Sequence, residues 1–296
     1  MSAQQEARSF LNKLLQAPPA LPFEPMLLPR LFAVTRDEAT ASIEDIVSLI
    51  EHSQKLTARI LAIANSAAYG LRYKVSTLRR AVSILGFREV RLLATLVATA
   101  SVIKEAGLPK NFNINALWCH QLETAFIAKT LVTELSDSSN VKNNRLGITP
   151  DEAYVAGLLH DIGKVFFAAS RPDIWQKVES MRMKALHSFS EAENAYWGID
   201  HALIGAEVLH TWNLPLLLSE PINWHHAPEL APLHVMETRL LAAANHIAHD
   251  GLDKEGQLND KALALLPAGC SATALGRAIA QNFADPSAKC LMTLVR

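Results

Sequence analysis

The chain has 296 residues, of which 50% are hydrophobic and 19% are charged, and its formal net charge is −1 at pH 7. This composition provides enough apolar surface for a sizeable core and excludes general disorder. A net charge near zero gives no long-range field for holding a phosphate backbone, so nucleic-acid binding is not the expected function.

No targeting or redox signature stands out in the sequence. Cys119, Cys270 and Cys290 are far apart with no CxxC pair, which indicates neither a disulfide framework nor a zinc knuckle. The N-terminus lacks the pattern of a signal peptide, and the most apolar run, residues 92–103, is shorter than the roughly 20 residues of a membrane span. We therefore expect a cytoplasmic protein without a membrane anchor.

In chain order, residues 1–19 have the mixed charged and apolar pattern of a short amphipathic helix. After them, leucine, alanine and isoleucine recur at three- and four-residue spacing, which predicts a run of helices. One helix begins after Ser42, because its hydroxyl can cap a helix together with Asp45 three residues later. The next helices are expected over residues 56–70, 76–86 and 88–107.

The small residues in these helices suit close packing in an orthogonal bundle. Asn65, Ser66 and Tyr69 are expected to tie one helix to the next, with a contact to a partner as the weaker alternative. The basic side chains between Arg79 and Arg91 are interpreted as a solvated helix face, with a nucleic-acid contact as the weaker alternative.

The second half of the chain predicts further helices. One begins near Asn115, a polar loop covers residues 136–150, and a single helix is expected from Asp151 through the sequence GLLHDIGK to residue 170. Pro172 opens another element. Later helices are expected over residues 188–198 and 200–215 and from residue 234 onward, with two or three short helices after residue 257.

The residues that carry chemistry are histidines and one aspartate. His160 and Asp161 are adjacent, and adjacent residues of a helix point about 100° apart. Both can reach one metal only at a helix end or distortion, or by serving neighbouring metals. Imidazole and carboxylate groups that converge from different elements are typical ligands of transition metals. The other candidate ligands are His120, His201, His225 and His226.

The chain resembles the HD superfamily and, within it, the HDOD domain. The segments LTARILAIANSAAYG and VSTLRRAVSILGFREVRLL carry the resemblance in the first half, and HDIGK, GIDHALIGAEVLHTWNLP and the later HH pair carry it in the second. The resemblance implies an all-α, orthogonal multi-helix bundle with an additional C-terminal helical segment. It implies a lead-in at residues 1–17, an HDOD domain at 18–230, divided at residue 110 into an HDOD-specific half and an HD-like half, and C-terminal helices at 231–296.

The resemblance also implies a set of metal ligands. In HD phosphohydrolases a first histidine, the HD pair and a late aspartate hold one metal, and dinuclear relatives such as the HD-GYP phosphodiesterases add three histidines. These ligands fall on His120, His160, Asp161, His201, His225 and His226. Asn245 takes the place of the late aspartate, and Asp250, past the end of the expected helix, is a poor substitute. Lys164 would face a substrate phosphate.

Asn245 changes the charge balance that such a site needs. Two divalent ions would bring about four positive charges against the single carboxylate of Asp161, and such an excess is expensive to desolvate. One ion could still bind Asp161, His201, His225 and His226. This ligand set favours a divalent transition metal such as iron, zinc or manganese over magnesium.

Each candidate also has a structural interpretation. His120 can be a core histidine, and the pair of His160 and Asp161 can be a hydrogen-bonded remnant that stabilises the bundle. His201 can be a helix-start residue, and the pair at residues 225–226 can form a turn. Lys164 can simply lie on a solvated helix end.

Two functional hypotheses follow. The first is a bacterial signal-transduction module that contacts signalling proteins, has little or no catalytic activity, and keeps a structural or sensory metal. The HDOD resemblance implies this, because the family is linked to signalling and is regarded as lacking hydrolase activity. The alternative is a metal-dependent phosphohydrolase or phosphodiesterase that acts on a nucleotide or cyclic dinucleotide. The sequence leaves the partner, the metal and the oligomeric state open.

Overall fold

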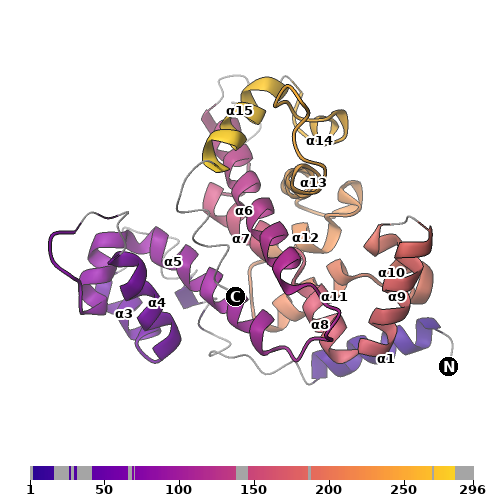
Figure 1. Ribbon diagram of the computed structural model, residues 1–296, viewed down its shortest axis with the longest axis horizontal. Coiled ribbons are helices and arrows are strands. Elements are labelled where there is room, and N and C mark those ends of the chain that lie inside the picture. The colour runs from indigo at the N-terminus through magenta and orange to yellow at the C-terminus, as the bar shows by residue number, and fades with distance from the viewer. Residues whose placement is uncertain are drawn as a thin grey trace. The chain divides into compact units, whose positions relative to one another are not determined.

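The structure, a computed structural model, describes residues 3–16, 27, 30–31, 42–65, 69, 71–137, 146–185, 188–268 and 270–283. The described residues form helices joined by turns, with no β-strand among them (Figure 1), so the predicted all-α class is confirmed. The chain divides into two compact units. The first comprises Met1–Ala20, Ala106–Thr211 and Pro215–Arg296, and the second comprises Leu21–Glu105 with Trp212–Leu214. The domain boundaries predicted at residues 17, 110 and 230 remain predictions.

The second unit contains α3 (Ile43–Ile50), α4 (Gln54–Ala64) and α5 (Leu78–Glu105). α3 begins where predicted: the Ser42 hydroxyl accepts a hydrogen bond from the Asp45 N–H, and the Asp45 carboxylate accepts one from the Ser42 N–H. α5 bends at Gly86, the predicted end of one helix, because its φ of 78° lies in the left-handed region that favours glycine. The buried core of this second unit includes Ile46, Ile50, Ile60, Val82 and Val90.

The end of α4 differs from the prediction. The helix ends at Ala64 rather than near Gly70, because Asn65 leaves the helical conformation. The Asn65 side chain accepts a hydrogen bond from the Val75 N–H (2.6 Å) and donates one to the Val75 carbonyl (2.8 Å). Asn65 therefore ties the end of α4 to the segment before α5. Ser66 and Gly70 lie outside the described residues.

The basic stretch of α5 is not a uniformly solvated face. Arg80 and Arg88 are exposed, but Arg91 is buried, contrary to the expectation. Arg79 forms an ion pair with Glu44 of α3. The stretch therefore mixes structural and exposed cations.

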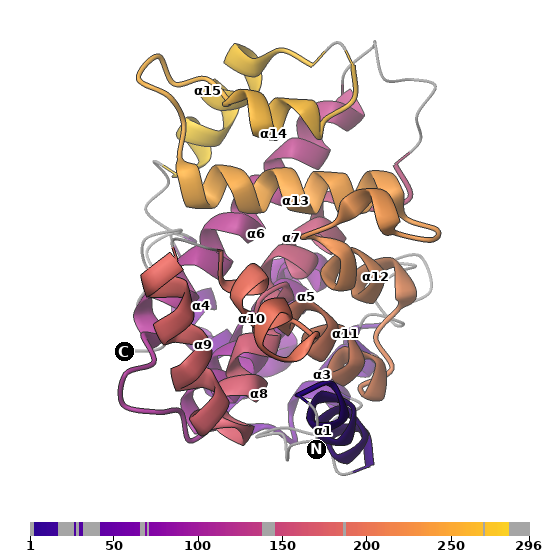
Figure 2. The ribbon, with the colours of Figure 1, turned by 90° about the vertical axis from the view of Figure 1, so that its right-hand side faces the viewer.

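The first unit holds most of the helices. These are α1 (Ala3–Gln16), α6 (Ile114–Asp137), α7 (Pro150–Leu159), α8 (Ile162–Ser170), α9 (Pro172–Ala185), α10 (Phe189–Trp197), α11 (His201–Thr211), α12 (Leu216–Trp224), the short 3₁₀ helix η3 (Pro228–Leu230), α13 (Val235–Asp250), α14 (Asp260–Ala264) and α15 (Ala272–Phe283). Figure 2 shows α13 lying across α6 and α7, and it packs against both. None of the described helices is both long and apolar enough to span a membrane.

The single helix predicted from Asp151 to residue 170 is wrong. The chain forms two helices, α7 and α8, and the break between them falls on His160 and Asp161. Asp161 has φ −101° and ψ 8°, outside the helical region. This break is the distortion that two adjacent residues need in order to face one centre. Most of the polar loop predicted over residues 136–150 lies outside the described residues, and α6 extends into it as far as Asp137.

Two glycines bring the helices around this break close together. A β-carbon on Gly157 of α7 would lie 2.6 Å from the α-carbon of Ala125 in α6. A β-carbon on Gly163 of α8 would collide with the carbonyl oxygen of His201, at the start of α11. Only glycine permits these two crossings. Gly157 allows α7 to pack closely against α6, and Gly163 allows α8 to pack closely against the start of α11.

Candidate metal centre

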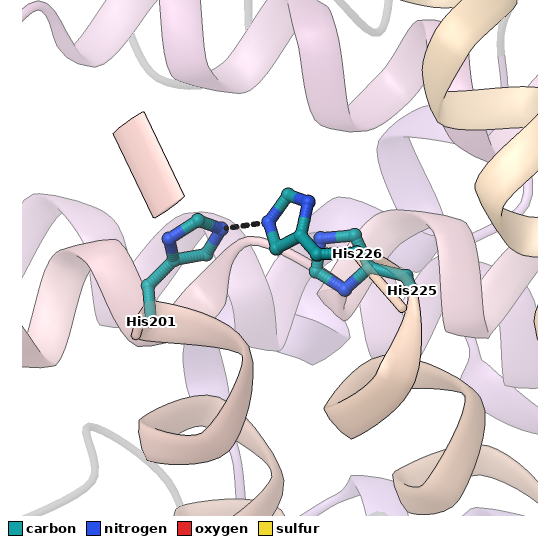
Figure 3. Close-up of side chains that lie close together, drawn as sticks. All are labelled: His201, His225 and His226. Atoms are coloured by element: carbon teal, nitrogen blue, oxygen red, sulfur yellow. Dashed lines mark hydrogen bonds between the residues drawn. The ribbon is translucent and has the colours of Figure 1, made fainter. Parts of the chain in front are cut away.

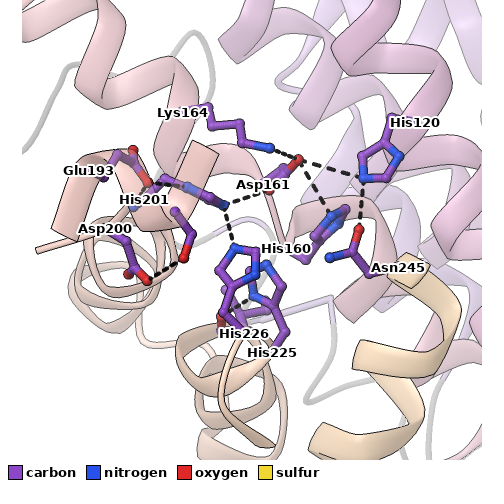
Figure 4. Close-up of polar contacts among 12 residues, drawn as sticks. His120, His160, Asp161, Lys164, Glu193, Asp200, His201, His225, His226 and Asn245 are labelled. Atoms are coloured by element: carbon purple, nitrogen blue, oxygen red, sulfur yellow. Dashed lines mark hydrogen bonds and ion pairs between the residues drawn. The ribbon is translucent and has the colours of Figure 1, made fainter. Parts of the chain in front are cut away.

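The carboxylate of Asp161 lies at the middle of a cluster of polar side chains (Figure 4). Its Oδ1 is 3.0 Å from Nε2 of His201, and its Oδ2 is 2.5 Å from Nζ of Lys164. His160 lies on the Oδ2 side, with its Nε2 3.5 Å away. Asp161 and both histidines are buried. One carboxylate therefore faces a different histidine with each of its oxygens.

The first cluster consists of His120, His160 and Asp161. Each offers one ligand atom, and these atoms lie within 4.8 Å of one another. His120 comes from the middle of α6, and its Nε2 is 3.8 Å from Oδ2 of Asp161. The same Nε2 is 2.9 Å from Oδ1 of Asn245 on α13. Because an amide oxygen only accepts, Nε2 of His120 donates this hydrogen bond.

The second cluster consists of His201, His225 and His226, whose ligand atoms also lie within 4.8 Å of one another (Figure 3). His201 begins α11, and the other two follow the end of α12. Nε2 of His226 is 3.0 Å from Nε2 of His201. His225 is buried, whereas His226 is exposed. The second cluster therefore has one side open to solvent.

Two buried ring nitrogens in these clusters have no hydrogen-bond partner among the described residues. They are the buried Nε2 atoms of His160 and His225. In each ring the other nitrogen, Nδ1, donates to the carbonyl of the residue three positions earlier: Gly157 at 2.8 Å and Ile222 at 2.7 Å. Each Nε2 therefore carries a lone pair that faces the site. Buried polar atoms without a partner are rare and call for an explanation, and a bound metal ion would provide one.

Glu193 of α10 belongs to this site, although the sequence analysis did not select it. It is fully buried, and its Oε2 lies 2.6 Å from Nδ1 of His201 and 3.0 Å from the backbone nitrogen of the same residue. A signal for it existed: Glu193 lies beside Ala192 and four residues before Trp197, on the apolar face of its helix. An acid on such a face needs a buried partner.

The surroundings set the charge of each ring. Burial lowers the pKa of His120, and it lowers that of His160 well below the ordinary value. Burial, together with the neighbouring His201, lowers the pKa of His225 to about 4. Burial also disfavours the charged form of His201, but the carboxylates of Glu193 and Asp161 outweigh it and raise its pKa to about 9. In the metal-free site at neutral pH, His201 is therefore the charged ring.

Asp161 stays ionised in this setting. Burial opposes ionisation, but electrostatic interactions with His160, Lys164 and His201 outweigh it and hold the pKa of Asp161 well below its ordinary value. Burial raises the pKa of Glu193, and His201 opposes that shift. The site therefore contains two buried acids, Asp161 and Glu193, and two cations, Lys164 and His201.

The residues selected from the sequence lie together in the first unit. Figure 4 shows the six expected ligands with Lys164 and Asn245 in one cluster. Lys164 contacts Asp161 and also lies 5.8 Å from the ring centroid of Phe189, so it is not simply a solvated residue at a helix end. Asp250 is the last residue of α13 rather than lying past its end, and it pairs with the exposed His249 instead of reaching the site.

The model of the HDOD domain family matches residues 21–228 of the chain. A curated relative, an uncharacterized protein of Treponema pallidum (strain Nichols), is 25% identical over 210 residues, which are 70% of this chain and 38% of that protein. The chain therefore spans little more than a third of that relative.

Solved structures share the fold. An HDOD domain protein of unknown function from Geobacter sulfurreducens has a TM-score of 0.75 at 23% identity, over 98% of this chain and 99% of that one. A candidate phosphohydrolase from Shewanella amazonensis SB2B has a TM-score of 0.72 at 22% identity, over 97% and 98%. A candidate signal transduction protein from Marinobacter aquaeolei VT8 has a TM-score of 0.71 at 19% identity, over 99% of this chain and 66% of that one.

Proposed function

The chain belongs to the HDOD domain family, and from this membership and the geometry of the clusters we propose that it is a regulatory module that holds a single divalent transition metal ion. The ion is iron, zinc or manganese, and its ligands are Asp161, His201, His225 and His226. The module acts in the bacterial cytoplasm by contacting signalling proteins or by binding a nucleotide or cyclic dinucleotide. Its phosphohydrolase activity is weak or absent.

The contact between Asn245 and His120 carries this proposal. Nε2 of His120, the atom that would bind a metal in the first cluster, donates its hydrogen bond to a neutral amide oxygen. An aspartate at position 245 would add a charge and a ligand oxygen, whereas the amide adds no charge and keeps a proton on the ring nitrogen. The first cluster therefore has one ligand oxygen and one negative charge fewer than it would have with an aspartate at position 245.

The second cluster has the better charge balance for one ion. Oδ1 of Asp161 approaches it at His201, and Glu193 supports the same ring from the other side. One divalent ion meets two buried carboxylates, whereas two ions would bring about four positive charges to the same pair, with Lys164 adding a fifth. We therefore expect the site to bind a single ion. When bound, such an ion supplies a Lewis-acidic centre, and here it would hold the ends of α11 and α12 together.

Metal analysis of a matched pair of variants tests the assignment. We expect the full-length protein to bind one equivalent of iron, zinc or manganese by mass spectrometric metal analysis. His225→Ala should lose the ion, and His120→Ala should keep it, because His120 belongs to the first cluster. The opposite result for the two variants would refute the assignment.

Activity assays test the regulatory assignment. Cyclic dinucleotides, nucleotides and a simple phosphate ester should be turned over little or not at all by the metal-loaded protein. Rapid metal-dependent turnover that His160→Ala abolishes would contradict a mainly regulatory role. Loss of activity in His160→Ala is informative because His160 belongs to the first cluster and is not among the proposed ligands.

A second candidate function is metal-dependent phosphoester hydrolysis. The supporting observation is that the three ligand atoms of the first cluster lie within 4.8 Å of one another, and that Asp161 of this cluster also contacts His201 of the second. Two ions joined by one carboxylate are the arrangement used for in-line phosphoryl displacement. This candidate requires that two ions bind despite the amide of Asn245, so a metal stoichiometry of two in the unmodified protein would favour it.

A further inference from the structure

We infer that Glu193 is a positioning residue, which holds His201 in the orientation that turns its Nε2 toward Asp161 and His226. The inference rests on the proposed function, since it concerns how the second cluster is prepared for its ion. Glu193 itself lies behind the ring, on the far side from the other ligands (Figure 4). Its role is to fix a ligand rather than to be one.

The position of His201 in its helix explains why a separate side chain is needed. His160 and His225 each donate Nδ1–H to the carbonyl three residues earlier, within their own helical turn. His201 cannot do this, because it is the first residue of α11 and no helical turn precedes it. The residue three positions earlier, Gly198, has a φ of 81° in the turn after α10. The acceptor for His201 must therefore come from another element, and α10 supplies it.

The geometry of the contact fixes both the backbone and the ring of His201. Oε2 of Glu193 accepts the backbone N–H at 3.0 Å and Nδ1–H at 2.6 Å, so one oxygen holds two donors of one residue. Both side chains are fully buried, with 0% exposure. With Nδ1 protonated, Nε2 is the nitrogen available for a metal. A carboxylate behind a ligand histidine also makes the ring a stronger donor than a carbonyl would.

α10 is anchored independently of the ligands. Trp197, one turn after Glu193, stacks on Phe167 of α8 at 4.9 Å between ring centroids. Its other neighbour is Phe10 of α1, at 5.3 Å. The first turn is closed by Ser188 and Glu191, which form a capping box. Because these contacts do not involve the clusters, Glu193 is in place before any ion binds.

Cobalt(II) titration of the full chain tests the inference. The comparison is between wild type, Glu193→Gln, and the control Glu191→Gln, which makes the same change at an exposed position of the same helix. We expect Glu193→Gln to bind Co²⁺ about 10- to 100-fold more weakly and with an altered visible absorption spectrum. Glu191→Gln should match wild type in both. The spectrum distinguishes a change at the ligand from a general loss of stability.

The outcomes separate the inference from the proposed function. If wild type binds Co²⁺ and Glu193→Gln binds it with the same affinity and spectrum, the positioning role is wrong and the proposed function stands. If wild type binds no Co²⁺, both are wrong.

Should Glu193→Gln fail to fold, nitrogen-15 NMR of the metal-free wild type still tests whether Glu193 positions His201. A proton on Nδ1 of His201 supports the inference, and an unprotonated Nδ1 overturns it.

Discussion

The two clusters of the candidate metal centre both contact Asp161, which belongs to the first and pairs with His201 of the second, but their histidines differ in what they bond when no ion is present. In the first cluster, Nε2 of His120 is committed to the amide of Asn245. In the second, Nε2 of His201 faces Asp161 and His226, and its other nitrogen is held by a buried acid. Three ligand atoms converge in both. Convergence is therefore not enough, because the group behind or beside each ring sets the charge of the ring and its hydrogen bonds.

The difference also concerns charge. The neutral amide of Asn245 lies beside His120 of the first cluster, whereas Glu193 adds an acid behind His201 of the second. In the proposed function, this amide on α13 weakens the first metal position and leaves the second intact. A protein can in this way keep the scaffold of a two-metal site while it retains the means to hold one ion.

Removing the shared carboxylate should have the largest effect. Asp161→Asn keeps the shape of the side chain but leaves His201 and Lys164 without their common partner in a buried site. We expect a loss of about 3–5 kcal/mol in the free energy of unfolding, as for other broken buried ion pairs, together with loss of the metal. Denaturant unfolding and metal analysis measure both. Asp173→Asn, at an exposed ion pair with Arg171, is the control and should cost at most about 1 kcal/mol.

Two glycine substitutions should separate the clusters. Gly163→Ala forces α8 away from the start of α11, and so moves Asp161 from His201. Gly157→Ala forces α7 away from α6, and so moves His160 from His120. Each should lower the free energy of unfolding by about 1–3 kcal/mol, as overpacking does. Zinc affinity, measured by competition with a chelating dye, should fall more in Gly163→Ala. Equal losses of affinity would contradict the assignment of the ion to the second cluster.

The sequence predicted the helices well where local signals were strong. Ser42, Pro172 and Gly86 carry information about capping, fixed φ and left-handed backbone, and each marks the boundary that it predicted. The break at residues 160–161 has no such signal, because His and Asp are compatible with a continuing helix and the interruption depends on tertiary packing. Spacing alone therefore predicted one helix where there are two.

The site shows the same limit. The resemblance to a family supplied the histidines, Asp161 and the position of Asn245, but it did not supply what each ring bonds. Glu193 is eight residues from His201 in sequence, and only the turn between α10 and α11 brings the two side chains together. Similarly, the bond between Asn245 and His120 joins residues 125 positions apart. Contacts of this kind follow from the packed fold and not from any local pattern.

Restoring the missing acid should make the two clusters more alike. In Asn245→Asp the new carboxylate would face His120. It would either accept the hydrogen bond of His120 as a charged group or bind an ion together with that ring. We expect metal content to rise from one ion per chain toward two, and any residual phosphoesterase activity to rise with it. His249→Asp, which adds an acid at an exposed position one turn later on α13, should change neither. A second ion that fails to appear in Asn245→Asp would show that the first cluster is disabled by more than this residue.

The two clusters should also differ in their pH dependence. His201 has a pKa raised to about 9, so an ion must displace its proton from Nε2, whereas His160 and His225 are already neutral above pH 6.5. Zinc affinity should therefore rise about tenfold per pH unit between pH 6.5 and 9, with one proton released per ion.

The free energy of unfolding of the metal-free protein should fall, rather than rise, over the same pH range. Because the pKa of His201 is higher in the folded state, protonation of His201 stabilises the folded protein. This stabilisation is fully present below the pKa of the unfolded state, about 6.5, and is lost as the pH rises through about 9. In Glu193→Gln, which removes one of the two acids that raise this pKa, both trends should shift to lower pH. Calorimetric titration and denaturant unfolding at matched pH measure them. If zinc affinity were independent of pH in this window, His201 could not be the ligand that gives up a proton.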